Sequence, residues 1–336
     1  MASLNYICII KQYYKDNDSN EKEDTMKKKW LVIAAVFLMG MMITGCKKTD
    51  DSPKNTDKLD IITTFYPMYD FTSKIVGNEA NVTMLIDSDV EPHDYEPSAK
   101  DLARIQDADV FIYNSKEMES WVPRLLDSLK DSEIKIIEAS ETLQMEKNDE
   151  HGEHDEDAHH HVYDPHVWLD PVLAQQQVTH ITDELSKAFP ENKEVFRENE
   201  ANFQEKLVQL DTDYRQAFQN VPNRTFVTQH AAFGYLAKRY DLHPVAIAGL
   251  TPDAEPSSKT LAQLKDFMEA NNITVIYTEQ GGSSKMAETI AKETNAEILT
   301  LHTLESLSKK EREEKEDYLS IMGENLKALS YSIHNK

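Results

Sequence analysis

Short apolar runs rich in β-branched residues alternate with amphipathic helical runs along the chain from residue 59 onward. The expected strands of the first half are 60–65, 82–86, 110–113 and 134–138, and those of the second half are 225–228, 245–248, 274–278 and 298–301. Apolar positions at helical spacing are found at 68–76, 99–106, 118–129, 231–240, 261–271, 286–294 and 318–333. Strands that alternate with helices predict the α/β class, with parallel sheets covered on both faces.

One long amphipathic helix is expected between the two halves, over residues 191–220. Apolar residues recur there at intervals of three, four or seven among many charges: Phe196, Phe203, Leu207, Leu210, Tyr214 and Phe218. A helix of about 30 residues is about 45 Å long. The pattern therefore predicts an N-terminal α/β lobe at 59–189, a linking helix at 190–221 and a C-terminal α/β lobe at 222–336.

Two helix starts carry local signals. Ser98 is followed three residues later by Asp101, which is a capping-box pattern. Asp170 precedes Pro171, so an acidic cap would be followed by proline at the first helical position. We therefore expect helices to begin immediately after Ser98 and Asp170.

The composition excludes several classes of function. The chain has 336 residues, of which 40% are hydrophobic, and a formal net charge of −24. Nucleic acid binding requires Lys and Arg that neutralise phosphates, so the acidic excess argues against a nucleic acid partner. Two cysteines cannot form a disulfide framework or a thiolate zinc site. The twelve histidines are more informative because they are unevenly placed.

The N-terminal segment has the pattern of an export signal. Lys27, Lys28 and Lys29 precede an apolar run of about 14 residues, which is shorter than the roughly 20 residues of a spanning helix. The following Ile-Thr-Gly-Cys, ending at Cys46, resembles the bacterial lipobox, in which the cysteine is lipidated and becomes the mature N-terminus. The alternative is an ordinary signal peptide with a buried cysteine nearby.

This pattern divides the N-terminus into three expected segments. Residues 1–25 precede the positively charged region and are expected to be an upstream extension from a misassigned start, with Met26 as the true start. Residues 26–45 are the expected lipoprotein signal peptide. Residues 46–58 are polar and are expected to form a flexible tether.

Three histidines and a glutamate are candidates for one metal site. His230 and Glu279 end predicted strands, His93 follows one, and His166 precedes a helix. Ligands of open parallel sheets bind outside the carboxyl ends of the strands, so a site between the halves could collect all four side chains. Each residue alone is also compatible with an ordinary loop or helix-cap role, and spacing leaves both interpretations open. His302, which ends another strand, is a reserve ligand.

A second group of histidines lies in a highly polar stretch at residues 149–161. Five histidines alternate there with acidic residues: His151, His154, His159, His160 and His161. The stretch is too polar to enter a core, so we expect a loop. Imidazoles and carboxylates suit transient capture of zinc, and the alternative is a solvated run of charges.

Four segments together resemble the zinc-binding lipoproteins of bacterial ABC importers, the metal-specific cluster A-I solute-binding proteins. They are T-T-F-Y-P-M-Y-D at 63–70, E-P-H-D-Y-E-P-S at 91–98, D-P-H-V-W-L-D-P at 164–171 and T-Q-H-A-A-F-G-Y at 228–235. The resemblance covers residues 59 to 334 and implies two α/β lobes bridged by a rigid helix, with the metal in the cleft between them.

The resemblance also implies the metal and its ligands. His93, His166, His230 and Glu279 match the family's ligand positions, whereas similar manganese carriers place a carboxylate where His230 stands. Three imidazoles and one carboxylate suit Zn²⁺, while manganese favours oxygen-rich sites. The fourth position stays open between Glu279, His302 and water.

The expected function is that of a receptor and not of an enzyme. A lipid on Cys46 would hold a monomer at the outer face of the cell membrane, where it would capture Zn²⁺ for an ABC permease and its ATPase subunit. Four protein ligands would close the zinc shell, whereas catalytic zinc keeps a position for water. The alternatives are a zinc-dependent hydrolase, with Glu91 or Asp94 as general base, and a surface adhesin of the same fold.

Overall fold

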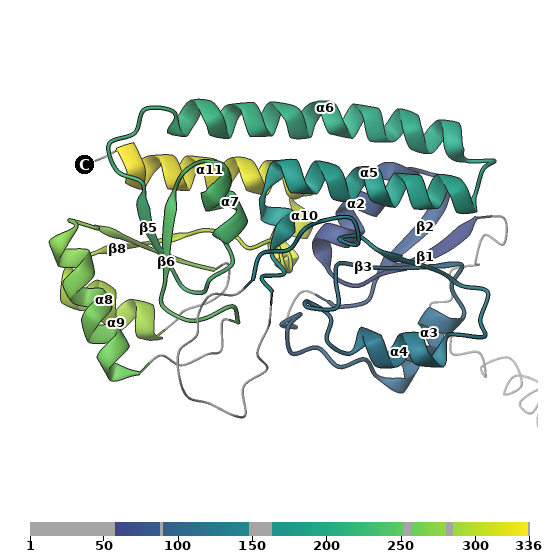
Figure 1. The fold of residues 1–336 in the computed structure, drawn as a ribbon, viewed down its shortest axis with the longest axis horizontal. Helices are drawn as coiled ribbons and strands as arrows, with labels where there is room; N and C mark the ends of the chain where they lie inside the picture. Colours follow the sequence, from purple (N-terminus) through teal and green to yellow (C-terminus); the bar gives the residue numbers. More distant parts are fainter. Residues whose placement is uncertain (1–57, 88–89, 148–162, 252–256, 280–284, 335–336) are drawn as a thin grey trace, which may run out of the picture. The chain divides into compact units, whose positions relative to one another are not determined.

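Each half of the chain folds around a parallel sheet of four strands, as the alternating pattern predicts (Figure 1). The computed structural model describes residues 58–87, 90–147, 163–251, 257–279 and 285–334. Cys46, the signal segment, the tether up to residue 57 and the five loop histidines lie outside the described residues. Within the described ranges, no helix combines the length and the apolar character needed to cross a membrane.

The sheet of the N-terminal lobe has the order β2-β1-β3-β4. Its strands are β1 (Leu59–Thr63), β2 (Ala80–Met84), β3 (Val110–Tyr113) and β4 (Lys135–Glu138). The helices α2 (Tyr66–Val76) and α5 (Pro171–Ala188) lie on one side of this sheet, and α3 (Ala99–Gln106) and α4 (Val122–Ser128) lie on the other (Figure 1). The sheet is therefore covered on both faces.

The C-terminal lobe repeats this strand order as β6-β5-β7-β8. Its strands are β5 (Thr225–Thr228), β6 (His243–Ala246), β7 (Val275–Thr278) and β8 (Glu297–Thr300). Its helices are α7 (Gly234–Arg239), α8 (Ser258–Ala270), α9 (Lys285–Thr294), α10 (Lys309–Glu313) and α11 (Tyr318–His334). In both lobes the first strand lies second in the sheet, with the next strand on one side of it and the later strands on the other. The strand order therefore reverses beside the first strand, and ligands of such sheets bind at the carboxyl ends of the strands at this point.

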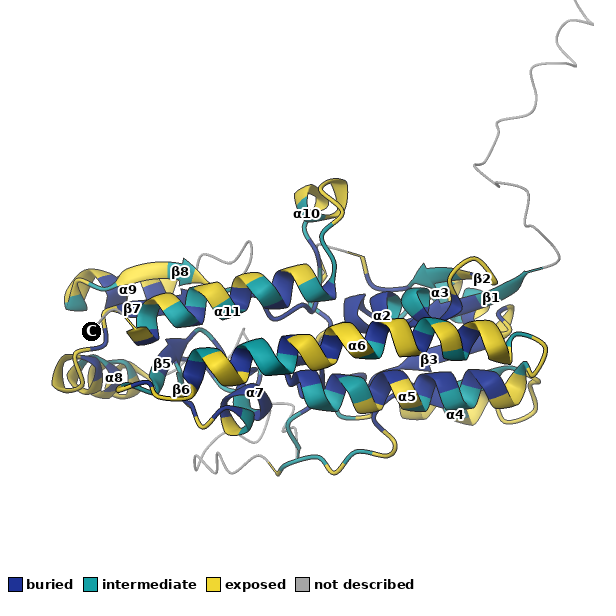
Figure 2. Cartoon of the chain, turned by 90° about the horizontal axis from the view of Figure 1, so that it is seen from above, coloured by how far each residue is buried: buried dark blue, intermediate teal, exposed yellow. Residues whose placement is uncertain are grey.

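The long helix is α6, at Lys193–Phe218, with 26 residues and a length of about 39 Å. It contacts α2 and α5 of the first lobe and α11 of the second. Its buried face contains the apolar residues that predicted it: Phe196, Phe203, Leu207, Leu210, Tyr214 and Phe218. Figure 2 shows buried and exposed positions alternating along this helix. The predicted fold class, with a long helix between two parallel-sheet lobes, is confirmed.

Local capping explains where two of the helices begin. Ser98 and Asp101 form the reciprocal capping box that the sequence predicts. The Asp170 carboxylate accepts a hydrogen bond from the Val172 amide at 2.8 Å, and Pro171 occupies the first turn of α5. These caps satisfy amide groups that have no partner inside the helix.

Most elements differ from their expected bounds by no more than three residues, and two differences are larger. The helix expected at 118–129 begins only at Val122, because the chain before it folds around the buried Glu119 carboxylate, which accepts hydrogen bonds from the Asn114 and Ser115 amides. The short helix α10 was not expected. Its signal was Ser308 followed three residues later by Glu311, a capping box that the structure contains.

Candidate metal centre

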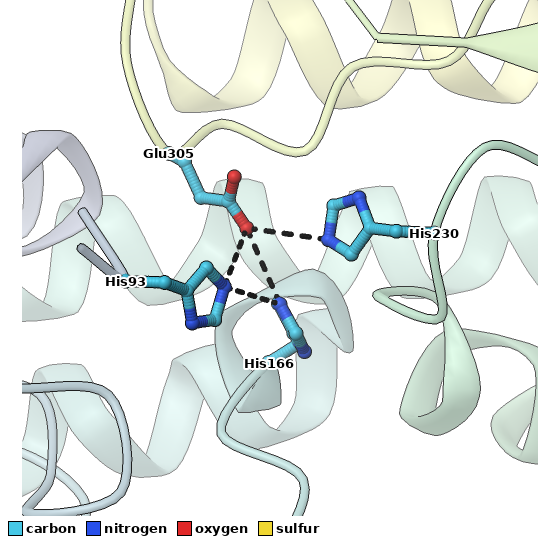
Figure 3. Close-up of side chains that lie close together, drawn as sticks. All are labelled: His93, His166, His230 and Glu305. Carbon is cyan, nitrogen blue, oxygen red and sulfur yellow. Dashed lines mark hydrogen bonds and ion pairs between the residues drawn. The ribbon is translucent and has the colours of Figure 1, made fainter. Parts of the chain in front are cut away.

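Four side chains from both lobes converge at the carboxyl edges of the sheets (Figure 3). His93 lies in the segment after β2, and His166 precedes a short 3₁₀ turn, η1, at Val167–Leu169. His230 follows β5, and Glu305 lies in the segment between β8 and α10. The four residues are 8%, 0%, 1% and 4% exposed, in that order. Among the described residues, these four form the one group of three or more His, Cys, Asp or Glu side chains that could hold a metal ion.

The spacing of the four ligand atoms fits a tetrahedral ion. The His93 and His166 Nε2 atoms are 3.3 Å apart. The Glu305 Oε1 atom lies 3.2 Å from Nε2 of His166 and 3.6 Å from Nε2 of both His93 and His230. Zinc bonds of about 2.0–2.1 Å give a tetrahedral edge of about 3.3 Å. These four of the six edges are therefore close to those of a tetrahedral zinc site, and all four ligand atoms lie within 4.8 Å of one another.

Carboxylates fix the proton positions on two of the imidazoles. His166 Nδ1 donates to Asp164 Oδ1 at 2.7 Å, and His230 Nδ1 donates to Glu279 Oε1. With Nδ1 of each ring bonded to a carboxylate, Nε2 is the ring nitrogen that faces the centre and is available to a metal. Such carboxylate–histidine pairs are typical of metal ligands because they orient the ring and raise its basicity.

A glycine makes one of these pairs possible. Gly234 begins α7, and a Cβ at this position would lie 2.9 Å from Asp164 Oδ2. The neighbouring Tyr235 hydroxyl donates to the Asp164 carbonyl at 2.8 Å. The second lobe thus bonds to the backbone of Asp164 and leaves room for its carboxylate, which orients His166 of the first lobe.

The charges of the cluster reflect its burial and its mixed composition. Burial opposes the charged form of Glu305, but contacts with three imidazoles outweigh burial and hold the pKa of Glu305 well below its usual range. Burial also opposes the protonated form of His230, yet its hydrogen bond to Glu279 and the nearby negative charge of Glu305 raise the pKa of this ring to about 10. Burial lowers the pKa of His93. In the absence of a metal, the negative charge of Glu305 is thus balanced by a protonated imidazole. A bound cation can replace the proton of that imidazole.

Buried atoms at the centre lack hydrogen bonds. Among the described residues, His230 Nε2 and Glu305 Oε1 are both buried without a hydrogen-bond partner. A buried polar atom without a partner is costly, so such atoms require an explanation. A bound cation would satisfy both.

Glu279 does not lie in the group of four, contrary to the sequence-based prediction. Glu279 follows β7 directly and therefore lies against the outer nitrogen of the His230 ring, while Glu305, on a longer segment after β8, reaches the centre. His302, the reserve ligand, also lies outside the group of four. Its Nδ1 accepts from the Leu304 amide at 2.8 Å, so its proton lies on Nε2, which faces Glu311 at 3.5 Å.

Sequence reasoning missed Glu305 because it does not end a strand. The available signal was its position three residues after His302, on the same sheet edge as the other candidates. The two candidate bases of a hydrolase lie outside the group of four: Glu91 accepts from the His93 amide at 3.3 Å, and Asp94 is exposed. Burial and the nearby Glu305 charge raise the pKa of Glu91 to about 8.

A family model described as "ZnuA: Zinc-uptake complex component A periplasmic" matches residues 61–331. The chain belongs to this family. It is 45% identical over 308 residues to the zinc-binding lipoprotein AdcA of Streptococcus pneumoniae (strain ATCC BAA-255 / R6), covering 90% of this chain and 60% of AdcA. It is 46% identical over 316 residues to the high-affinity zinc uptake system protein ZnuA of Bacillus subtilis (strain 168), covering 92% of this chain and 99% of that protein.

Solved structures of similar proteins share the fold. The Zn(II)-bound ZnuA-like domain of Streptococcus pneumoniae AdcA superposes with a TM-score of 0.73 at 45% identity, covering 83% of this chain and 100% of that one. The laminin-binding protein Lmb of Streptococcus agalactiae superposes with a TM-score of 0.73 at 35% identity, covering 82% of this chain and 99% of that one. That protein is described as bifunctional, with adhesin and metal transporting activity. The chain spans 60% of the length of AdcA.

Proposed function

We propose that this protein is an extracytoplasmic receptor that captures Zn²⁺ and delivers it to an ABC-type import permease and its ATPase subunit. The observation that carries the proposal is the buried group of three imidazoles and one carboxylate with tetrahedral spacing. Membership of the ZnuA family and the names of the relatives from Streptococcus pneumoniae and Bacillus subtilis support it.

The ligands are Nε2 of His93, His166 and His230 together with Oε1 of Glu305. Three nitrogens and one oxygen suit zinc better than manganese, which prefers oxygen ligands. The four side chains fill a tetrahedral shell and leave no position for a water nucleophile. The site therefore favours binding over hydrolysis.

The segments outside the described residues complete this proposal. Cys46 carries the lipid anchor after removal of the signal peptide at 26–45, and residues 46–58 tether the receptor, a monomer, to the outer face of the membrane. The histidines of residues 149–161 capture zinc transiently when it is scarce. Deletion of 149–161 should leave the affinity of the central site unchanged while slowing growth under zinc limitation. Equal growth of the deletion strain and the parent would contradict this role.

A metal titration tests the central site. The purified protein, freed of metal by chelation, should bind one equivalent of Zn²⁺ in competition with a chelator of known affinity. The Trp168 indole lies 5.2 Å from the His166 ring between centroids, so its fluorescence should report the binding. His230→Ala should lose tight binding, whereas the exposed His243→Ala should retain it. Undiminished affinity in His230→Ala would overturn the assignment.

Adhesion is a second candidate function, favoured by the likeness to the laminin-binding protein of Streptococcus agalactiae. Immobilised laminin is the direct probe. Saturable binding that survives His230→Ala would establish an adhesive surface separate from the metal centre. Absence of saturable binding by both the metal-free and the zinc-loaded protein would exclude this function.

A further inference from the structure

The two carboxylate oxygens of Glu305 have different environments. Oε1 faces the three imidazoles at 3.2–3.6 Å, and Oε2 accepts a hydrogen bond from the Thr303 hydroxyl at 3.2 Å. Figure 3 shows one oxygen turned to the histidines and the other turned away from them. Thr303 is 5% exposed, so this hydrogen bond is shielded from solvent.

The segment that carries Thr303 is held on both sides. The Trp168 indole, from the first lobe, donates to the Thr303 carbonyl at 2.8 Å. Asn325 of α11 accepts from the His302 amide at 2.8 Å and donates to the His302 carbonyl at 2.7 Å. These bonds fix the backbone from which the Thr303 hydroxyl reaches Glu305.

The residue between Thr303 and Glu305 adopts a costly backbone conformation. Leu304 has a φ of +63°, in the left-handed region that leucine rarely adopts. It is fully buried, and its amide donates to His302 Nδ1. Such strain persists only where surrounding contacts determine the conformation. The turn that directs Glu305 inward is therefore imposed by its surroundings.

We propose that Thr303 is a specificity-determining residue that keeps Glu305 a one-oxygen ligand. A carboxylate can bind a metal through one or both oxygens. A second oxygen would add a fifth ligand, which suits manganese and opposes the tetrahedral shell that zinc prefers. By engaging Oε2, the Thr303 hydroxyl favours four-coordinate zinc. This inference rests on the proposed zinc-binding function.

The test compares Thr303→Val, which keeps the shape but loses the hydroxyl, with Thr303→Ser, which keeps the hydroxyl. Zn²⁺ and Mn²⁺ affinities are measured by chelator competition, and bound Co²⁺ reports the geometry, because tetrahedral Co²⁺ absorbs visible light far more strongly than higher-coordinate Co²⁺. Thr182→Val is the matched control, since this buried hydroxyl donates within α5 at 2.8 Å, to the Val178 carbonyl.

We expect Thr303→Val to lower the ratio of zinc affinity to manganese affinity about tenfold or more and to weaken the tetrahedral Co²⁺ absorption. Thr303→Ser and Thr182→Val should keep both properties. An equal loss of affinity for both metals with an unchanged Co²⁺ spectrum would reduce Thr303 to a structural residue and overturn the proposal. An unchanged affinity ratio in Thr303→Val would do the same.

Zinc X-ray absorption of the wild-type protein tests the inference without a variant. One carboxylate oxygen in the zinc shell is expected, and a bidentate carboxylate would refute the role of Thr303 while leaving zinc binding intact. Failure of the wild-type protein to bind zinc would instead refute the proposed function. The two failures are therefore distinguishable.

Discussion

Neutralising Glu305 and Glu279 separately should reveal which carboxylate binds the metal and which orients a histidine. Glu305 Oε1 lies within 3.6 Å of all three imidazole Nε2 atoms, whereas Glu279 contacts His230 through the opposite ring nitrogen. Both substitutions, Glu305→Gln and Glu279→Gln, remove one negative charge and preserve the shape of the side chain. A difference between them therefore reports position.

The expected loss of zinc affinity is larger for Glu305→Gln than for Glu279→Gln. Removing one charged member of a buried ionic group costs about 3–5 kcal/mol, so Glu305→Gln should weaken zinc binding between about 150-fold and 5,000-fold. Loss of the carboxylate that orients a ligand costs about 10–100-fold, so Glu279→Gln should lose about 1.4–2.7 kcal/mol. The glutamine oxygen can still accept from His230 Nδ1, which favours the lower end of that range.

The assay is chelator competition with purified metal-free protein at constant pH. Glu313→Gln, in the exposed part of α10, is the charge-matched control and should bind zinc as tightly as the wild-type protein. Thermal unfolding of each metal-free variant separates loss of the site from loss of the fold. A larger loss for Glu279→Gln than for Glu305→Gln would refute the assignment and restore Glu279 as the ligand.

Three further outcomes are expected. Zinc affinity should fall as the pH is lowered from about 9 to about 6, because the pKa of His230 is raised to about 10 and zinc must displace this proton; a pH-independent affinity would contradict the charge assignment. Burial raises the pKa of Asp70 to about 6. The free energy of unfolding therefore holds the full contribution of the protonated carboxyl below about pH 4, and this contribution is lost as the pH rises through 6 and the buried group ionises. Asp70→Asn, which leaves Lys74 bonded to Asp317 at 2.7 Å, should therefore raise the free energy of unfolding at pH 7 by about 1–3 kcal/mol and change it little at pH 4, as measured by urea denaturation; a lower value at pH 7 would argue against the burial effect. Small-angle X-ray scattering should give the same radius of gyration with and without zinc, and a clear contraction would indicate hinge closure.

The fold followed from the sequence because its signals are local. The spacing of Phe196, Phe203 and Leu207 defines one face of a long helix, and this face is the one that α6 buries. Strands that alternate with helices predict a parallel sheet, and both halves of the chain have this alternation. The ends of the elements were predicted less accurately than their order. At the start of α4, for example, the buried Glu119 carboxylate organises the preceding chain through contacts that no local sequence pattern reveals.

The candidate site was only partly predictable. His93, His166 and His230 could be grouped because strand ends meet at one edge of a sheet and because their motifs resemble a known family. The fourth position could not be chosen from spacing, since Glu279 and Glu305 both follow strands of the second sheet. Tertiary structure decides between them, by placing Glu279 beside Nδ1 of His230 and Glu305 beside Nε2.

Contacts across the lobes constrain how an ion can enter and leave this site. Trp168 donates to the Thr303 carbonyl at 2.8 Å, Tyr235 donates to the Asp164 carbonyl at 2.8 Å, and Arg239 pairs with the buried Asp170 at 2.8 Å. Opening the lobes as a hinge would break all three at about 1–3 kcal/mol each, a total comparable to the stability of a typical domain. Movement of one ligand-bearing segment would open the tetrahedral shell to water without breaking all three of these contacts. We therefore expect zinc exchange to proceed through local movement of a ligand-bearing loop, with α6 holding the two lobes at a fixed separation.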